Sequence, residues 1–133
     1  MQVSKIDHVN IVTDDLDETM QFYQQVIGLA PKENLAMSSD FRGAWMCDPA
    51  GNALVHLVEK TPGQPYGEGH ETGVPTGAIH HVALQCSGID AMLARLEELE
   101  IAHRVNRIDH IGLTQIFVSD PNAVTLELNF PGD

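Results

Sequence analysis

The strongest constraint on the fold is an internal repeat. The stretch "IDHVNI" at residues 6–11 matches "IHHVAL" at residues 79–84, an offset of 73 positions. Further along, "DPAGNALVHL" (48–57) matches "DPNAVTLEL" (120–128), where the offset falls to 72 and then 71. A chain that repeats over most of its length is built from two copies of one supersecondary unit. The fall from 72 to 71 within this second match indicates that the first copy has gained one residue there.

Each copy reads as a strand, a helix and then three strands. Apolar residues spaced by three and four predict the helices. The first helix has Asp15, with Glu18 three positions later, at its start and Gly28 beyond its end, and the second helix starts after Ser87. The sequence therefore predicts an α+β fold of two tandem βαβββ modules, with strands near 4–12, 30–38, 41–47 and 53–60, and near 78–86, 102–107, 112–119 and 123–130.

The length of 133 residues predicts a single domain, 1–133. Within it we expect module one at 1–60, a linker at 61–77 and module two at 78–133. The linker is rich in glycine and proline, which is typical of loops. It is interpreted either as a lid over a site or as a tether between the modules.

Charge and composition exclude several classes of partner. The net charge of -12 repels phosphate backbones, so we expect no nucleic-acid partner, whereas a basic small molecule would be attracted. No apolar run approaches the roughly 18 residues of a membrane span, so no membrane partner is expected. The start of the sequence lacks the apolar core of a signal peptide, and there are two cysteines, Cys47 and Cys86. These features predict a cytoplasmic protein.

Strand alternation separates candidate site residues from the core. In residues 124–130 the apolar side chains alternate with polar ones, and Glu127 lies on the polar face. In the first predicted strand, His8 lies on the face opposite Val9. The repeat places His81 on the same face as His8, whereas His80 falls on the opposite face.

In the last strand of module one, His56 takes the place of Glu127. Each module thus offers one side chain from its first strand and one from its last, giving His8, His56, His81 and Glu127. Imidazole and carboxylate ligands suit Zn, Fe(II), Mn, Co or Ni, so we predict one shared divalent metal site. The alternative is that the histidines only satisfy hydrogen bonds in a polar groove. His8, His81 and Glu127 alone also form the triad of non-haem Fe(II) oxygenases, which leaves His56 as a ligand or an outer group.

These features resemble the vicinal oxygen chelate superfamily, which includes glyoxalase I, methylmalonyl-CoA epimerase, fosfomycin-resistance enzymes, bleomycin-resistance proteins and extradiol dioxygenases. The "IDHVNI" and "HHVAL" openings, the helix pattern "DLDETMQFYQQVIGL" (15–29) and the "LEL" ending carry the resemblance. It implies that the sheets form a curved cup with the helices outside. A divalent metal would bind inside through the four residues and chelate two vicinal oxygens of a small-molecule substrate. The resemblance also implies a homodimer, with the cup built within one chain or shared between subunits.

Three functions remain open on the sequence. The first is a metal-dependent lyase or isomerase, in which Glu127 or a nearby group moves the proton. The second is an Fe(II) extradiol-type ring-cleaving dioxygenase, although such enzymes are usually twice as long. The third is a non-catalytic small-molecule binding or resistance protein, which the acidic charge favours slightly and the ligand set disfavours. Histidine at position 56 departs from the carboxylate of glyoxalases and the glutamine of the epimerase. We favour the first function.

Overall fold

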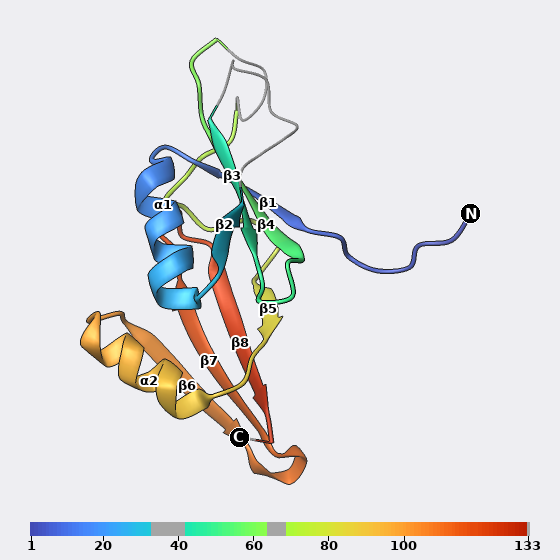
Figure 1. The fold of residues 1–133 in the computed structure, drawn as a ribbon, viewed down its shortest axis with the longest axis vertical. Helices are drawn as coiled ribbons and strands as arrows, with labels where there is room; N and C mark the ends of the chain where they lie inside the picture. The colour runs from blue at the N-terminus through green and yellow to red at the C-terminus, as the bar shows by residue number, and fades with distance from the viewer. Residues whose placement is uncertain (33–41, 64–68, 133) are drawn as a thin grey trace. The chain divides into compact units, whose positions relative to one another are not determined.

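The computed structural model describes residues 1–32, 42–63 and 69–132. The chain divides into two compact units, Met1–Thr72 and Gly73–Asp133, and the boundary lies in the stretch predicted as a linker. Each unit contains one four-stranded mixed sheet and a helix, in the order that the repeat predicts (Figure 1). The α+β class and the two-module organisation are confirmed.

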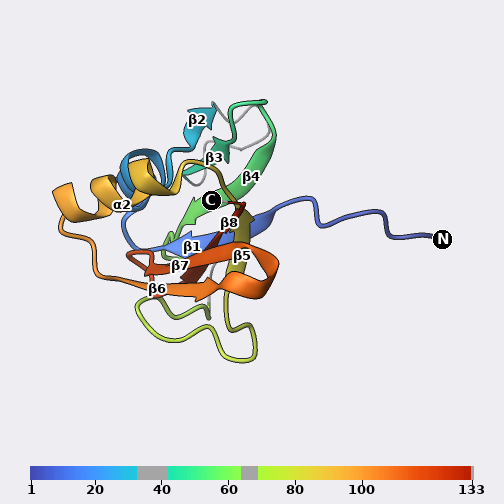
Figure 2. The same ribbon diagram turned by 90° about the horizontal axis from the view of Figure 1, so that it is seen from below.

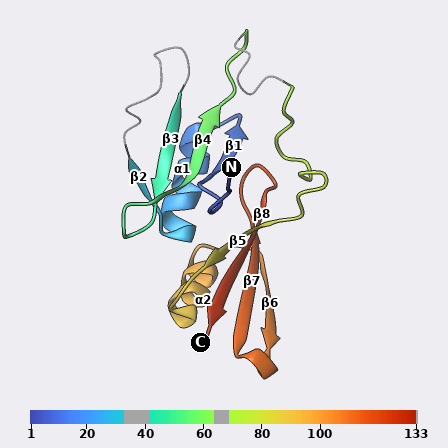
Figure 3. The ribbon, with the colours of Figure 1, turned by 90° about the vertical axis from the view of Figure 1, so that its right-hand side faces the viewer.

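The first unit has the strand order β1-β4-β3-β2, in which β1 runs parallel to β4 and the other neighbours are antiparallel. Helix α1 packs against β3 and β4 (Figure 3). It continues directly into a short π-helix. The elements are β1 (Val9–Thr13), α1 (Leu16–Phe22), the π-helix (Tyr23–Ile27), β2 (Ala30–Lys32), β3 (Gly43–Cys47) and β4 (Ala53–Glu59).

The second unit repeats this topology with the order β5-β8-β7-β6. Strand β5 is parallel to β8, and β6 and β7 form an antiparallel hairpin (Figure 2). The elements are β5 (Val82–Gln85), α2 (Ile89–Glu98), β6 (His103–Ile108), a 3₁₀ turn (Asp109–Ile111), β7 (Leu113–Ser119) and β8 (Thr125–Pro131). No helix in the described part of the chain is long and apolar enough to cross a bilayer.

The predicted helix caps are present in the first unit. The Asp15 side chain accepts a hydrogen bond from the Glu18 N–H at 3.0 Å, which satisfies a donor that the helix itself leaves free. At the other end, Gly28 adopts φ 86°, a left-handed conformation that glycine reaches without a steric cost. These two residues set the limits of the helical segment.

Alternation divides each sheet into an apolar face and a polar face. In β8, Leu126, Leu128 and Phe130 are buried, whereas Glu127 and Asn129 are half-buried on the other face, as predicted. The buried residues of the two units include Ile11, Leu16, Phe22, Tyr23, Val26, Met46, Val55 and Leu57, and Met92, Leu96, Ile116 and Val118. We call the polar face of each sheet its site face.

The extra residue of the first copy forms a β-bulge. Strand β3 pairs Met46 with Val55 but Cys47 with Ala53, so Leu54 has no partner across the ladder. The second unit pairs the matching strands without interruption. A bulge adds one residue to a strand and restores the register beyond it.

Because the bulge restores the register, His56 and Glu127 occupy equivalent positions in the two sheets. His56 pairs with Asn10 of β1 and Trp45 of β3. Glu127 pairs with the matching positions of β5 and β7. The repeat-based alignment of His56 with Glu127 is therefore confirmed by the pairing of the strands.

The first strand of each unit begins later than predicted. Strand β1 starts at Val9 and β5 at Val82, so His8 and His81 each lie one residue before a strand. Residues 1–8 run away from β1 as an extended segment in Figure 1. The pairing to the parallel neighbour starts at these residues, Val9 with Val55 and Val82 with Leu126.

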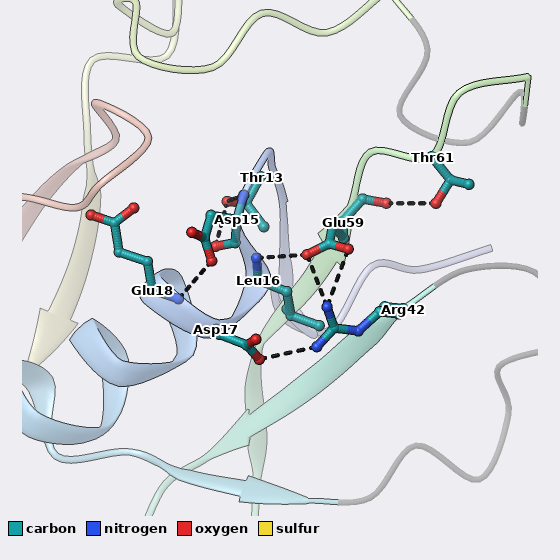
Figure 4. A network of polar contacts seen from close by, with 8 residues as sticks. All are labelled: Thr13, Asp15, Leu16, Asp17, Glu18, Arg42, Glu59 and Thr61. Carbon is teal, nitrogen blue, oxygen red and sulfur yellow. Dashed lines mark hydrogen bonds and ion pairs between the residues drawn. The ribbon is translucent and has the colours of Figure 1, made fainter.

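A polar network ties β4 to the start of α1 in the first unit (Figure 4). A Glu59 carboxylate oxygen accepts a hydrogen bond from the Leu16 N–H at 2.9 Å, and Arg42 Nη1 lies 3.4 Å from both Glu59 oxygens. Arg42 also donates to Asp17 at 3.0 Å. Coulombic attraction, first to Glu59 and then to Asp17, raises the pKa of Arg42. The network fixes the start of α1 against the end of β4.

Candidate metal centre

An aromatic cluster surrounds the candidate ligands of the first unit. The His56 ring stacks on the indole of Trp45, with 4.1 Å between ring centroids and 4° between the planes. The His8 ring meets the same indole edge-on at 4.7 Å, and the His8 and His56 centroids are 6.2 Å apart. Trp45 therefore contacts both imidazoles and restricts how their rings can turn.

His56 has one nitrogen held and one unused. Its Nδ1 lies 3.0 Å from the Asn10 side-chain amide nitrogen. Its Nε2 is the one buried side-chain polar atom without a hydrogen-bond partner among the described residues. Burial, and secondly the neighbouring His8, lowers the pKa of His56. The unpartnered Nε2 fits a metal ligand in the neutral tautomer that carries its proton on Nδ1, which requires the Asn10 side-chain amide to turn its oxygen toward Nδ1.

His8 is oriented by its sequence neighbour. Its Nδ1 lies 2.7 Å from an Asp7 carboxylate oxygen, and this hydrogen bond is the main reason that the pKa of Asp7 is lowered. Donation from Nδ1 leaves Nε2 with a free lone pair, the arrangement found where a carboxylate orients a metal-binding histidine.

The candidate ligands of the second unit touch each other. His81 Nε2 lies 3.2 Å from a Glu127 carboxylate oxygen, Oε2. Two donor atoms that each lie about 2.1 Å from a metal, at a tetrahedral or octahedral angle, are roughly 3.0–3.4 Å apart. The pair is thus already spaced as two ligands of one ion.

A chain of amides holds Glu127 in place. Gln115 Nε2 donates to Glu127 Oε1 at 2.9 Å and to Asn129 Oδ1 at 3.1 Å. Asn129 Nδ2 donates to the same Glu127 oxygen at 2.9 Å, and Asn106 Nδ2 donates to Gln115 Oε1 at 2.8 Å. Oε1 therefore accepts two amide hydrogen bonds, while Oε2 is turned toward His81.

His80 lies closer to His81 than strand alternation predicted. His80 Nδ1 lies 2.9 Å from His81 Nδ1, and their ring centroids are 5.1 Å apart. Alternation does not separate the two rings because β5 begins only at Val82. His80 is exposed and contacts the nitrogen of His81 that does not face Glu127.

The structure therefore brings the four predicted residues together as two pairs, one in each unit. His8 and His56 lie in the first unit, and His81 and Glu127 in the second. Within either unit, the described residues include no group of three or more His, Cys, Asp or Glu side chains that could hold a metal ion. Each pair supplies two donors, which is half of a tetrahedral set.

Sequence reasoning missed part of the surroundings of these pairs. Trp45 was not among the residues predicted at the site, yet it stacks on His56. Asp7 was not among them either, yet its carboxylate is hydrogen-bonded to His8. The stacking follows from the register, which pairs Trp45 with His56 across β3 and β4.

The sequence of this chain also matches a known protein family. A model described as Glyoxalase/Bleomycin resistance protein/Dioxygenase superfamily matches residues 5–128, well over half of the chain. The chain belongs to this superfamily.

Individual relatives are distant. "Glyoxylase I 4" of Arabidopsis thaliana is 26% identical over 96% of this chain and 71% of its own length. A glyoxylase/bleomycin resistance protein/dioxygenase domain from Frankia sp. EAN1pec has a TM-score of 0.74 at 18% identity, covering 98% of this chain and 99% of that one. The fosfomycin resistance protein FosX of Listeria monocytogenes, in complex with Mn(II) and sulfate, has a TM-score of 0.67 at 14% identity, covering 97% and 93%. The superfamily thus includes a metal-binding member of the same fold.

Proposed function

We propose that this chain is a divalent-metal-dependent enzyme of the glyoxalase-like type, a lyase or isomerase. Its substrate would be a small molecule that chelates the metal through two vicinal oxygens. The observation that carries the proposal is the His81–Glu127 pair, whose 3.2 Å spacing matches two ligands of one metal ion. The similarity to an Arabidopsis protein named as a glyoxylase I supports the reaction class.

The proposed ligands are His8, His56, His81 and Glu127, with Zn, Fe(II), Mn, Ni or Co as the candidate ions. The buried, unpartnered Nε2 of His56 supports its inclusion. We further propose that the protein is a homodimer. A bound divalent ion would polarise a substrate carbonyl and stabilise negative charge on its oxygen.

The protein's own residues would then position the substrate and move its proton. Glu127 Oε1 is held by two amides, so Oε2 would bind the metal with one lone pair and contact the reacting group with the other. A carboxylate fixed in this way can accept a proton from carbon and return it at a neighbouring position. We therefore assign Glu127 the catalytic role.

Turnover of a hemithioacetal by protein loaded in turn with Zn, Ni, Mn and Co tests this proposal. We expect turnover with at least one metal, a loss of at least about 100-fold in Glu127→Gln, and wild-type rates in His103→Ala, an exposed histidine on β6. Absence of turnover with every metal would reject the hemithioacetal version. Oxygen uptake with catechols under Fe(II) would instead identify the dioxygenase, for which the His8, His81 and Glu127 triad is suited.

A further inference from the structure

The site face of the second unit carries one cation beside the candidate metal pair. In residues 73–133 the cationic side chains are Arg95, Arg104 and Arg107, and there is no lysine. Arg95 lies on α2, and Arg107 pairs with the buried Thr114, on the face opposite the candidate site. Arg104 pairs with Phe117 on the site face.

The register connects Arg104 to Glu127 in one row across the sheet. Arg104 of β6 pairs with Phe117 of β7, and Phe117 pairs with Glu127 of β8. Directly paired residues project from the same face of a sheet. Two strand spacings separate Arg104 from Glu127, a distance of roughly 10 Å.

Phe117 holds the arginine head over this row. The Arg104 guanidinium carbon lies 4.3 Å from the centroid of the Phe117 ring. The same ring lies 6.4 Å from the His81 ring. Stacking on an aromatic face pre-orients the guanidinium fork, so less side-chain freedom is lost when it binds a ligand.

The guanidinium is available to a ligand. Arg104 is exposed, and within the described residues no carboxylate forms an ion pair with it. The chain as a whole has a charge of -12 and repels anions, so any preference for an anion must come from a local cation. A single guanidinium neutralises one negative charge and matches a carboxylate through two parallel hydrogen bonds.

We propose that Arg104, held by Phe117, binds a carboxylate group of the substrate while two vicinal oxygens of the same molecule occupy the metal. This inference rests on the proposed function and specifies its substrate class, a small monoanionic acid. It replaces the expectation, drawn from net charge alone, that a basic small molecule is preferred.

Three hydroxamates with the same chelating oxygens test the proposal. The probes are benzohydroxamate and its para-carboxyl and para-aminomethyl derivatives, which are neutral, anionic and cationic near pH 7. Dissociation constants are measured by calorimetry on Zn-loaded protein. We expect the anionic probe to bind about tenfold more tightly than the neutral one, and the cationic probe to bind more weakly than the neutral one.

Matched arginine variants assign the preference to its source. Arg104→Gln should lose the anion preference while its affinity for the neutral probe stays within about twofold, which also shows that the variant is folded. Arg107→Gln, on the opposite face of β6, should keep the preference. An anion preference that persists in Arg104→Gln, or is absent from the wild type, overturns the inference alone. If no hydroxamate binds, the metal site of the proposed function fails and this inference fails with it.

Discussion

Two histidines that are adjacent in the sequence have different roles in this structure. His81 faces Glu127 with Nε2, whereas His80 reaches only the far nitrogen of His81. A metal ligand forms a bond to the ion, whereas an outer partner only orients that ligand. In the proposed metal site, His81 is the ligand and the preceding His80 is the neighbour that orients it.

Removing each histidine should separate these roles. We expect His81→Ala to lose bound metal, His80→Ala to keep it at saturating concentrations, and His103→Ala to behave as wild type. Metal content after gel filtration, measured by inductively coupled plasma mass spectrometry, checks this. Loss in His80→Ala with retention in His81→Ala would show that the site is built on the other histidine.

The amide that supports Glu127 should affect metal affinity. Gln115→Leu removes one of the two amide donors to Oε1, so Glu127 becomes less well oriented, and the dissociation constant for the metal should rise about 10-fold or more. Gln85→Leu is the control, since Gln85 lies on the same face without a hydrogen bond to Glu127. Equal affinities in both variants would mean that the amide chain does not position the carboxylate.

The lowered pKa of His56 predicts a pH dependence of stability. Between its folded-state pKa and the ordinary value of 6.5, the unfolded chain binds more protons than the folded one. The stabilising contribution is therefore complete above pH 6.5 and is lost as the pH falls toward the folded-state pKa. Denaturation of metal-free protein across this range should show a slope that His56→Asn reduces. An identical slope in both proteins, or an NMR titration of His56 at or above 6.5, would contradict this.

At the scale of single residues, the repeat and strand alternation were enough to align His56 with Glu127. They were not enough for Asp7 or His80, because alternation describes strands and both residues precede one. The stacking of Trp45 on His56 depends on a cross-strand pairing between β3 and β4. Such a contact joins positions that sequence spacing alone does not relate.

At the scale of elements, local chemistry sets the helix limits and pairing sets the strand limits. The Asp15 cap and Gly28 were readable because a helix end is determined within a few residues. The start of β1 could not be predicted in this way, because a strand exists only where a neighbouring strand pairs with it. The offset change indicated an extra residue in the first copy, but only the ladder placed it at Leu54.

The anchor between β4 and α1 should contribute measurably to stability. Glu59 is mostly buried and binds the Leu16 N–H, so Glu59→Ala should lower the free energy of unfolding by about 1–2 kcal/mol. Asp17→Ala, which removes only an exposed contact to Arg42, should cost at most about 0.5 kcal/mol. Urea denaturation compares the two variants. A larger loss from Asp17→Ala would contradict this account of the network.

At the scale of the whole molecule, the repeat accounts for two similar sheets and for a divided set of ligands. Each unit carries an aromatic residue beside its candidate ligand, Trp45 at His56 and Phe117 at Glu127. The units differ in polar support, since His56 keeps an unpartnered nitrogen while Glu127 is bound by amides. The repeat places the two candidate donors at matching positions, and the copies differ in the donor that they carry, an imidazole at His56 and a carboxylate at Glu127.

The most direct test of the central claim, that both pairs hold one metal ion, is the metal stoichiometry of variants from each unit. We expect one ion per chain in the wild type and less than about a tenth of that in both His8→Ala and Glu127→Ala, because each change removes one of the donors that hold the ion. Circular dichroism would confirm that each variant is folded. Two ions per chain, or full metal content in either folded variant, would show that the pairs do not form one site.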